Sequence, residues 1–350
     1  MPAQDAGGTA GPQVTAGRRA RRPGGPFLTV LLWLAVVGVV GLTLVRLLPF
    51  DGATPFAQVV GGTPWVLLAA VVVLGLAALA RRWRASVVTL VAVVALAVVV
   101  LPFYGSVPPL GPRDPAVTTS NQTATVMTVN ARYGGADAAR LVAEVRERGV
   151  TVLAVVELNG GLVDRLQDAG LDDVLPHRTL ARVDDATGNR GGGLWSLAPQ
   201  TDADEGPAGT WFAMPSATVA VGATPVRFTA VHTVPPTLGS VSIWQSDLAV
   251  VRQRAEDSPV RQVLMGDYNA TYDHASFRRT LGDRFRDANR LWARGLLPTW
   301  PTDRHVPPLL ALDHVVVERG TTVLDLDSVT LPGTDHRALV ATLRIPAPVS

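Results

Sequence analysis

The segment Val263-Leu264-Met265-Gly266-Asp267-Tyr268-Asn269-Ala270 indicates how the chain folds and where its chemistry lies. Its apolar run, 263–265, is typical of a strand that is buried on both faces. Gly266 suits a strand exit, because glycine reaches backbone angles that other residues avoid. Asp267 and Asn269 are two residues apart, so their side chains point the same way in extended backbone. The segment therefore predicts a carboxylate and an amide at a strand end, where α/β proteins place functional groups. An ordinary Asp/Asn turn is the alternative.

Composition narrows the class of protein. The 350 residues allow one large domain or two smaller ones, and the net charge of +2 does not require a nucleic-acid partner. The chain has no cysteine, which excludes disulfides, thiolate zinc sites and a cysteine nucleophile. Apolar residues are concentrated before Phe103.

The first hundred residues predict a membrane anchor. Residues 1–26 are rich in Gly, Ala, Thr and Pro with four arginines, which indicates a disordered basic tail. Three apolar runs follow within 27–103, at 27–49, at 65–80 (with a possible start at 56) and at 85–103. Each is long enough for a transmembrane helix. A signal peptide and a buried three-helix core are the alternatives, and the later runs and the lack of any polar face oppose them.

Charge at the ends of these runs predicts their orientation. Arginines cluster in the tail (Arg18, Arg19, Arg21 and Arg22) and in the turn 81–84, whereas the 50–64 loop has Asp51 and neither lysine nor arginine. The positive-inside rule then places the N-terminus in the cytoplasm and the chain after Phe103 outside it. Residues 104–123 are rich in proline and predict an extended linker.

Residues 124–346 alternate between strand and helix patterns. Strands are expected at 124–129, 150–156, 174–180, 193–197, 217–221, 226–231, 263–265, 310–317, 321–331 and 338–343, and helices at 136–148, 162–169 and 240–257. The first strand–helix–strand unit is expected to be parallel, which brings Asn130 and Glu157 to one edge. The block 172–233 is expected to be antiparallel, and the stretch after Tyr272 irregular.

Polar residues recur where these strands end or turns begin. Taken singly, most have ordinary explanations as turn formers, a core histidine or a loop pair, although an unpaired carboxylate at the buried position of Glu157 is costly. Their joint occurrence is the signal, and the set comprises Asn130, Glu157, His232, Asp267, Asn269, Asp313, Asp335 and His336.

Six ordered motifs containing these residues resemble the endonuclease/exonuclease/phosphatase superfamily, which includes DNase I-like nucleases, sphingomyelinases and inositol-polyphosphate phosphatases. The motifs are Thr128-Val129-Asn130, Val155-Val156-Glu157, Ala230-Val231-His232, Gly266-Asp267-Tyr268-Asn269, Leu312-Asp313-His314 and Thr334-Asp335-His336. The resemblance implies an α/β fold, a DNase I-like two-sheet α/β sandwich preceded by three transmembrane helices. Departures from the family pattern at Ala131, Val156, Tyr268 and Thr334 remove no charge.

The resemblance also implies roles that agree with the needs of phosphoester hydrolysis, namely a cation, an activated water and donors to the phosphate. Glu157, Asn130 and Asp335 would bind Mg²⁺, with Mn²⁺ as a possible substitute. Asp267 would activate the water, and Asn269 and His232 would donate to the phosphate. His336 would bind the phosphate or transfer a proton, held by Asp313. Three other histidines, His274, His305 and His314, are interpreted as structural or surface residues.

These expectations describe a membrane-anchored, Mg²⁺-dependent phosphoester hydrolase with an extracytoplasmic active site and a lipid-linked phosphate or diphosphate as substrate. The arrangement resembles membrane-bound members of the superfamily associated with glycopeptide resistance. A surface nuclease is the enzyme alternative, with a basic groove supplied by Arg178, Arg182, Arg190, Arg278, Arg279, Arg284 and Arg286. A catalytically inactive binding or sensor domain is the non-enzyme alternative. The leaving group and the oligomeric state stay open.

Overall fold

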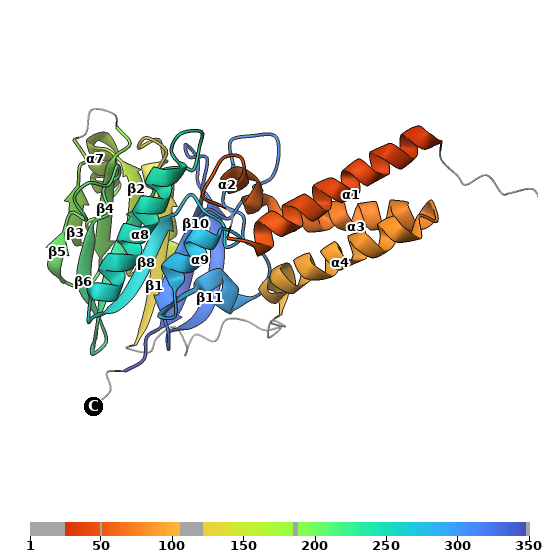
Figure 1. Cartoon of the computed structure of the whole chain (residues 1–350). Coiled ribbons are helices and arrows are strands. Elements are labelled where there is room, and N and C mark those ends of the chain that lie inside the picture. The colour runs from red at the N-terminus through yellow and green to blue at the C-terminus, as the bar shows by residue number, and fades with distance from the viewer. Residues whose placement is uncertain (1–24, 50, 106–121, 185–187, 348–350) are drawn as a thin grey trace, which may run out of the picture.

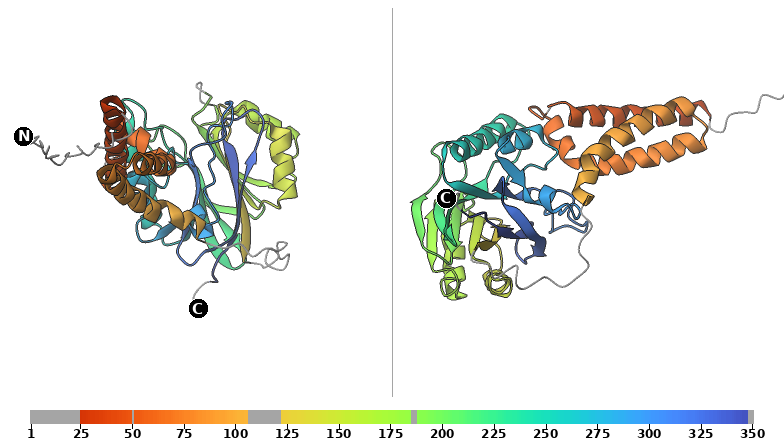
Figure 2. Two further views of the ribbon diagram at one scale, coloured as in Figure 1. Left: turned by 90° about the vertical axis from the view of Figure 1, so that its right-hand side faces the viewer. Right: turned by 90° about the horizontal axis from the view of Figure 1, so that it is seen from below.

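Three long helices project from one end of a two-sheet domain (Figures 1 and 2). The computed structural model describes residues 25–49, 51–105, 122–184 and 188–347. The long helices are α1 (Pro26–Leu47), α3 (Thr63–Leu79) and α4 (Trp83–Val100), with the short α2 (Phe56–Val59) and two 3-10 turns, η1 (Val60–Gly62) and η2 (Leu101–Tyr104). The predicted tail at 1–26 and linker at 104–123 lie almost entirely outside the described residues.

The three helical runs are long and apolar enough to cross a membrane. They span Pro26–Leu47, Phe56–Leu79 and Trp83–Tyr104, and at most a third of the most apolar window of each is buried inside the protein. Small residues such as Ala70, Ala77 and Ala92 are buried where the helices meet, while most of the leucines point outward. Close approach at small residues with bulky side chains outside is the packing expected of helices in lipid.

The domain after the helices is a two-sheet α/β sandwich, as the sequence predicted. The first sheet has the order β11-β12-β1-β2-β4-β3 and the second the order β5-β6-β7-β8-β10-β9. The strands of the first sheet are β1 (Thr123–Asn130), β2 (Val152–Leu158), β3 (His177–Ala181), β4 (Gly191–Ser196), β11 (Thr322–Thr330) and β12 (Arg337–Arg344). Those of the second are β5 (Gln200–Asp204), β6 (Ser216–Val221), β7 (Thr224–His232), β8 (Arg261–Asp267), β9 (Phe285–Asp287) and β10 (Asp313–Glu318).

Each sheet contains one parallel pair, and both pairs direct their strand ends to the same side of the sandwich. The pairs are β1 with β2 and β7 with β8, connected through α6 (Ala138–Glu147) and α8 (Val241–Asp257) respectively. Parallel strands joined by a helix must end at the same edge. The core between the sheets is formed by alternating apolar residues such as Val126, Val156 and Met265.

Helices cover the outer faces of both sheets (Figure 1). The apolar sides of α6 and α7 (Gly160–Asp168) pack on the first sheet through residues such as Leu141 and Leu162. Helices α8 and α9 (Ala275–Leu281) cover the second through residues such as Trp244 and Phe277.

Two expectations for this domain were incomplete. The stretch after Tyr272 is not irregular, because it contains α9, β9 and α10 (Ala288–Trp292), which are too short to show a period in the sequence. The block 172–233 is antiparallel in its pairings, but it divides between the sheets: β3 and β4 join the first, and β5, β6 and β7 join the second. Edge strand β5 was missed because its sequence, QTDAD, is polar.

The helices are attached to the sandwich by buried polar contacts. Arg46, near the end of α1, donates to the Asp273 carboxylate at 2.6 Å, and both side chains are only 8% exposed. Burial raises the pKa of Asp273, an effect that the Arg46 charge opposes. Asp51 accepts from the backbone N–H and the hydroxyl of Ser276, and His274 Nε2 donates to the carbonyl of Ala57 at 2.7 Å. These contacts fix the position of the sandwich relative to the helix ends.

Candidate active site

The polar residues singled out in the sequence gather at the edge where the parallel strands end. In the first sheet, Asn130 at the end of β1 lies beside the last residues of β2. In the second, His232 on β7 pairs with Asp267 on β8, and antiparallel β10 brings Asp313 opposite the same Asp267. Strand register alone therefore accounts for much of the site.

Gly266 is required by the close approach of two strands. Its φ is 154°, and a Cβ at this position would lie 1.9 Å from the carbonyl oxygen of Val231. Any side chain there would push β7 and β8 apart and displace Asp267. This confirms the expectation that Gly266 has an unusual backbone conformation.

Glu157 is presented by a β-bulge. The pairing of β2 with β4 shifts between Val156 and Leu158, and Glu157 between them has a φ of 53°. A bulge of this kind turns the side chain of the extra residue away from the regular alternation of the strand, often at a functional site. Glu157 Oε1 accepts from the Asn130 amide and Oε2 from the backbone N–H of Tyr133, both at 3.0 Å.

Asn130 joins two carboxylates, of which Asp267 is buried and Glu157 is half-buried. Its Nδ2 donates to Glu157 Oε1 and to Asp267 Oδ2, each at 3.0 Å. Burial raises the pKa of Glu157, and burial raises the pKa of Asp267 to about 7. Asp267 also accepts from the backbone N–H of Asn269 at 2.7 Å. The Asn269 amide donates to the carbonyl of Thr233 at 2.8 Å, so this residue braces the β8 turn.

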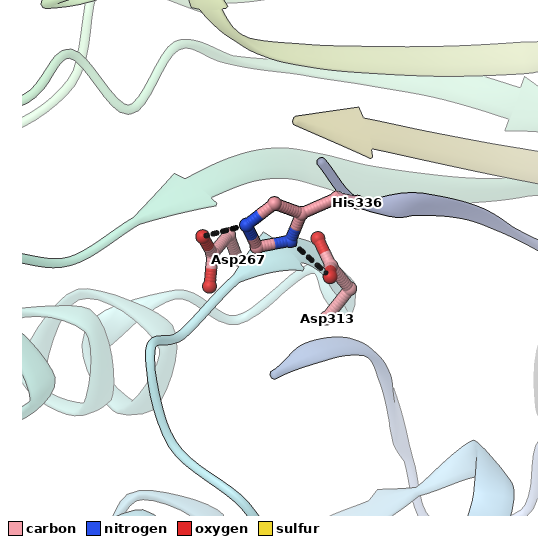
Figure 3. Close-up of side chains that lie close together, drawn as sticks. All are labelled: Asp267, Asp313 and His336. Carbon is pink, nitrogen blue, oxygen red and sulfur yellow. Dashed lines mark hydrogen bonds and ion pairs between the residues drawn. The ribbon is translucent and has the colours of Figure 1, made fainter. Parts of the chain in front are cut away.

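A histidine is held between two aspartates (Figure 3). His336 Nδ1 donates to Asp313 Oδ2 at 2.8 Å, and its Nε2 lies 3.8 Å from Asp267 Oδ2. Burial alone would lower the pKa of His336, but the negative charges of Asp313 and Asp267 outweigh it and raise the pKa to about 10. The ring is therefore an imidazolium at neutral pH, with Nε2–H directed toward Asp267.

His232 is in a different protonation state. Burial, together with the positive charge of His336, lowers the pKa of His232 to about 3, so this ring is neutral. Its Nε2 lies 3.9 Å from Glu157 Oε1 and from Asp267 Oδ2. The ring stacks on Phe212 with 3.7 Å between centroids, and its Nδ1 is buried with no hydrogen-bond partner among the residues that the structure describes. A neutral, stacked ring can offer one N–H to a bound group.

Asp335 stands at the mouth of the site. Its Oδ2 accepts from Trp300 Nε1 at 3.2 Å, and its Oδ1 lies 3.8 Å from Arg132 Nε. Of the three expected metal ligands, Asn130 and Glu157 are thus in direct contact, while the carboxylate of Asp335 is turned toward Trp300 and Arg132.

Two groups of side chains are candidates for holding a metal ion. Ligand atoms of Asp267, Asp313 and His336 lie within 4.8 Å of one another. His336 is a poor ligand there, because a protonated ring has no lone pair to offer. The carboxylate of Glu157, which is 17% exposed, fits a hard cation better. The oxygen of Asn130 accepts from the backbone N–H of Arg132 at 2.9 Å, and its amide nitrogen faces Glu157. Glu157 is therefore a suitable oxygen ligand for a divalent cation, and Asn130 would have to turn its amide to become a second one.

Several residues of the site were not singled out in the sequence. Arg132 and Tyr133 both have positive φ, at 45° and 56°. They form the turn from which the backbone N–H of Tyr133 donates to Glu157. Their position, two and three residues after Asn130, was the one feature of the sequence that could have pointed to a role in the site. Phe212 and Trp300 contact the site from loops far away in the sequence, and nothing local marks them.

The seven arginines proposed for a basic groove do not form one surface. Arg284 pairs with Glu318 at the end of β10 opposite to Asp313, and Arg279 lies near Asp51 beside the helices. Only Arg182 and Arg190 reach the loop that carries Trp211, next to Phe212. The remaining members, Arg178, Arg278 and Arg286, bond to Asp172 or to nearby backbone carbonyls.

Two of the remaining histidines have internal partners. His314 is bonded to Asp287 Oδ2 at 2.7 Å and to the carbonyl of Ala270 at 2.8 Å, and His274 joins α2 to the sandwich. His305 is exposed on the surface. Their interpretation as structural or surface residues agrees with these positions.

Comparison with known proteins relates this site to a family. Residues 127–336 match the Endonuclease/Exonuclease/phosphatase family. No curated protein sequence matches the chain. Among solved structures, a humanized D. rerio TDP2 is 16% identical with a TM-score of 0.54, covering 64% of this chain and 100% of its own. A TDP2 from D. rerio complexed with single-strand DNA product is 15% identical with a TM-score of 0.51, covering 64% and 99%.

A bacterial structure is similar to the same degree. The endonuclease/exonuclease/phosphatase from Beutenbergia cavernae is 19% identical with a TM-score of 0.50, covering 65% of this chain and 73% of its own. At these identities the structural likeness establishes a shared DNase I-like fold.

Proposed function

Because the chain belongs to the endonuclease/exonuclease/phosphatase family of metal-dependent phosphoester hydrolases, we propose that it hydrolyses a lipid-linked phosphate or diphosphate at the outer surface of a membrane. The observation that carries this proposal is the union of two features in one chain. One is the connected set of Glu157, Asn130, Asp267 and His336, and the other is the group of three helices long and apolar enough to span a bilayer.

The proposed roles follow from the charge state of each side chain. Glu157 and Asn130, with Asp335 at the mouth, hold Mg²⁺ or Mn²⁺, which when bound neutralises charge on the phosphate oxygens. Asp267 orients the attacking water and accepts its proton, because a pKa of about 7 suits a general base near neutral pH. Neutral His232 donates a hydrogen bond to the phosphate, and Asn269 donates the amide N–H that does not bond to the carbonyl of Thr233.

His336 serves as the cationic donor of the site. Its pKa of about 10 keeps the ring protonated at neutral pH, and Asp313 holds Nδ1 so that Nε2–H faces the reacting phosphate. A positioned imidazolium stabilises the charge that develops on phosphate oxygens and can give its proton to a leaving oxygen. The Asp313 carboxylate accepts from the ring through Oδ2, so Asp313 acts on the substrate through His336 and is a positioning residue.

Attachment of the sandwich to the helices supports a membrane-bound substrate. The contacts of Arg46 with Asp273 and of Asp51 with Ser276 hold the site at a fixed distance from the helix ends. A substrate whose phosphate lies at the bilayer surface is presented to such a site at constant height. The scattered positions of the arginines give less support to a nucleic-acid substrate, although a D. rerio TDP2 of the same fold is complexed with single-strand DNA product.

The proposed orientation has the sandwich outside the cytoplasm. Arg81, Arg82 and Arg84 lie at the turn between α3 and α4, at the ends of the helices remote from the sandwich (Figure 1). Under the positive-inside rule that turn is cytoplasmic. We expect a reporter fused after Ser350 to be active only when it is a type that needs export. Strong activity of a reporter that functions only in the cytoplasm would reverse the orientation.

A substrate comparison tests the proposed activity. The purified full-length protein with Mg²⁺ is given a prenyl diphosphate in vesicles, single-stranded DNA or a sphingomyelin-type diester, each with and without a chelator. We expect release of phosphate from the prenyl diphosphate, abolished by the chelator, with little cleavage of the other two. Preferential cleavage of DNA would instead support the surface nuclease.

A further inference from the structure

One loop of the sandwich connects the active site to the ends of the helices. Residues 296–312, called here the bridging loop, lie between α10 and β10. On the active-site side, Trp300 donates to the Asp335 carboxylate, and Thr299 Oγ1 accepts from the backbone N–H of Asp313 at 3.3 Å. Asp303 of the loop pairs with Arg132 at 2.9 Å. The bridging loop therefore forms one wall of the site.

The other side of the bridging loop contacts the start of α3. Trp65 Nε1 donates to the carbonyl of Leu309 at 3.0 Å, and Leu309 also lines a small cavity with Pro64 and Gly61. Helix α3 has 17 residues, about 25 Å at 1.5 Å per residue, so most of it is needed to cross the apolar layer. With α3 across the bilayer, Trp65 at its sandwich end would lie at the height of the lipid headgroups, where tryptophan is enriched.

The tip of the bridging loop exposes apolar and basic side chains together. Val306 is 47% exposed and Leu309 38%, and the side chain of Arg304 is 65% exposed. Trp65 itself is 44% exposed, so the apolar surface continues from the helix onto the loop. Apolar side chains with an arginine among them suit the boundary between headgroups and acyl chains, because the guanidinium reaches phosphate while the apolar groups leave water.

We propose that the tip of the bridging loop, Arg304–Leu309, lies in the headgroup layer of the same bilayer that the helices cross. Trp300 and Asp303, which form one wall of the active site, are then close to the membrane surface. The proposed bilayer contact rests on the membrane anchoring in the proposed function, and it adds the path by which a lipid-linked phosphate reaches the site without leaving the membrane.

Because the chain has no cysteine, single introduced cysteines can report the depth of the loop. Val306→Cys and, as a control, Leu197→Cys are labelled with a fluorophore in the full-length protein and reconstituted into vesicles containing anionic lipid. Leu197 is 55% exposed and follows β4 at the end of the sheet opposite to the site. We expect lipids with a quencher near the headgroup to quench the label at position 306 several times more strongly than the label at 197.

Equal quenching at the two positions would overturn the proposed bilayer contact of the loop, whatever the enzyme hydrolyses. A second measurement separates this from the activity. Val306→Asp should lower hydrolysis of prenyl diphosphate in vesicles relative to hydrolysis of a water-soluble, short-chain diphosphate, and an unchanged ratio would count against the inferred path. Strong quenching at position 306 without hydrolysis of any lipid-linked phosphate would sustain the bilayer contact and refute the proposed substrate.

Discussion

Glu157→Gln is expected to reduce Mg²⁺-dependent turnover by about 10³-fold, which corresponds to ~4 kcal/mol of the several kcal/mol that a bound metal supplies. Glutamine keeps the shape of the side chain but removes the charge that a hard cation requires. One hydrogen bond also changes, because Asn130 and Tyr133 both donate to the carboxylate and the amide has a single acceptor oxygen.

The measurement is the initial rate as a function of Mg²⁺ concentration, with thermal unfolding to show that the variant is folded. Glu256→Gln is a matched control, since Glu256 lies on α8 and pairs with Arg252 away from the site. Turnover of Glu157→Gln close to the wild type at limiting Mg²⁺ would show that Glu157 is not a ligand.

Asp313→Asn is expected to lower turnover by about 10²-fold, the lower range for a positioned acid or base. The Asp313 carboxylate raises the pKa of His336, so its replacement lowers that pKa from about 10 toward the ordinary value. The protonated ring is the working form and is lost as the pH rises through its pKa. The alkaline limb of the pH–rate profile should therefore move to lower pH.

A double-mutant cycle distinguishes positioning from independent contributions. Asp313→Asn and His336→Ala should together cost little more than His336→Ala alone, because the two residues act as one unit. Asp287→Asn is the matched control: Asp287 holds His314 at 2.7 Å in the same chemical way, but outside the site. It should leave the alkaline limb in place. Asp313 would have no role in positioning His336 if the losses in turnover were fully additive. The same conclusion would follow if Asp313→Asn left the alkaline limb of the pH–rate profile in place.

The fold was largely predictable because its main elements have strong patterns. The strands expected at 124–129, 150–156 and 263–265 became β1, β2 and β8, and the amphipathic segments 136–148 and 240–257 became the crossover helices α6 and α8. Parallel pairing then placed Asn130 beside the end of β2 and His232 beside Asp267. Those juxtapositions follow from pattern and register, which are local properties.

Other features were inaccessible from the sequence because they depend on contacts between distant segments. The bulge at Glu157 arises from a register shift against β4, and no local sequence pattern predicts that shift. The stacking of Phe212 on His232 and the hydrogen bond from Trp300 to Asp335 join loops that fold together only in three dimensions. Arg46 stood out as a charge in an apolar helix, but its partner is 227 residues away.

The distance along the chain between Arg46 and Asp273 bears on the order of assembly. As the chain is synthesised, Arg46 is made long before Asp273 exists, so its guanidinium must first be held by water or by other polar groups. Asp273 lies just before α9, after strands β1 to β8 have been made. Docking of the sandwich onto the helices is then a late step of assembly. A sandwich made without its helices would leave Asp273 and Ser276 without the partners that Arg46 and Asp51 provide.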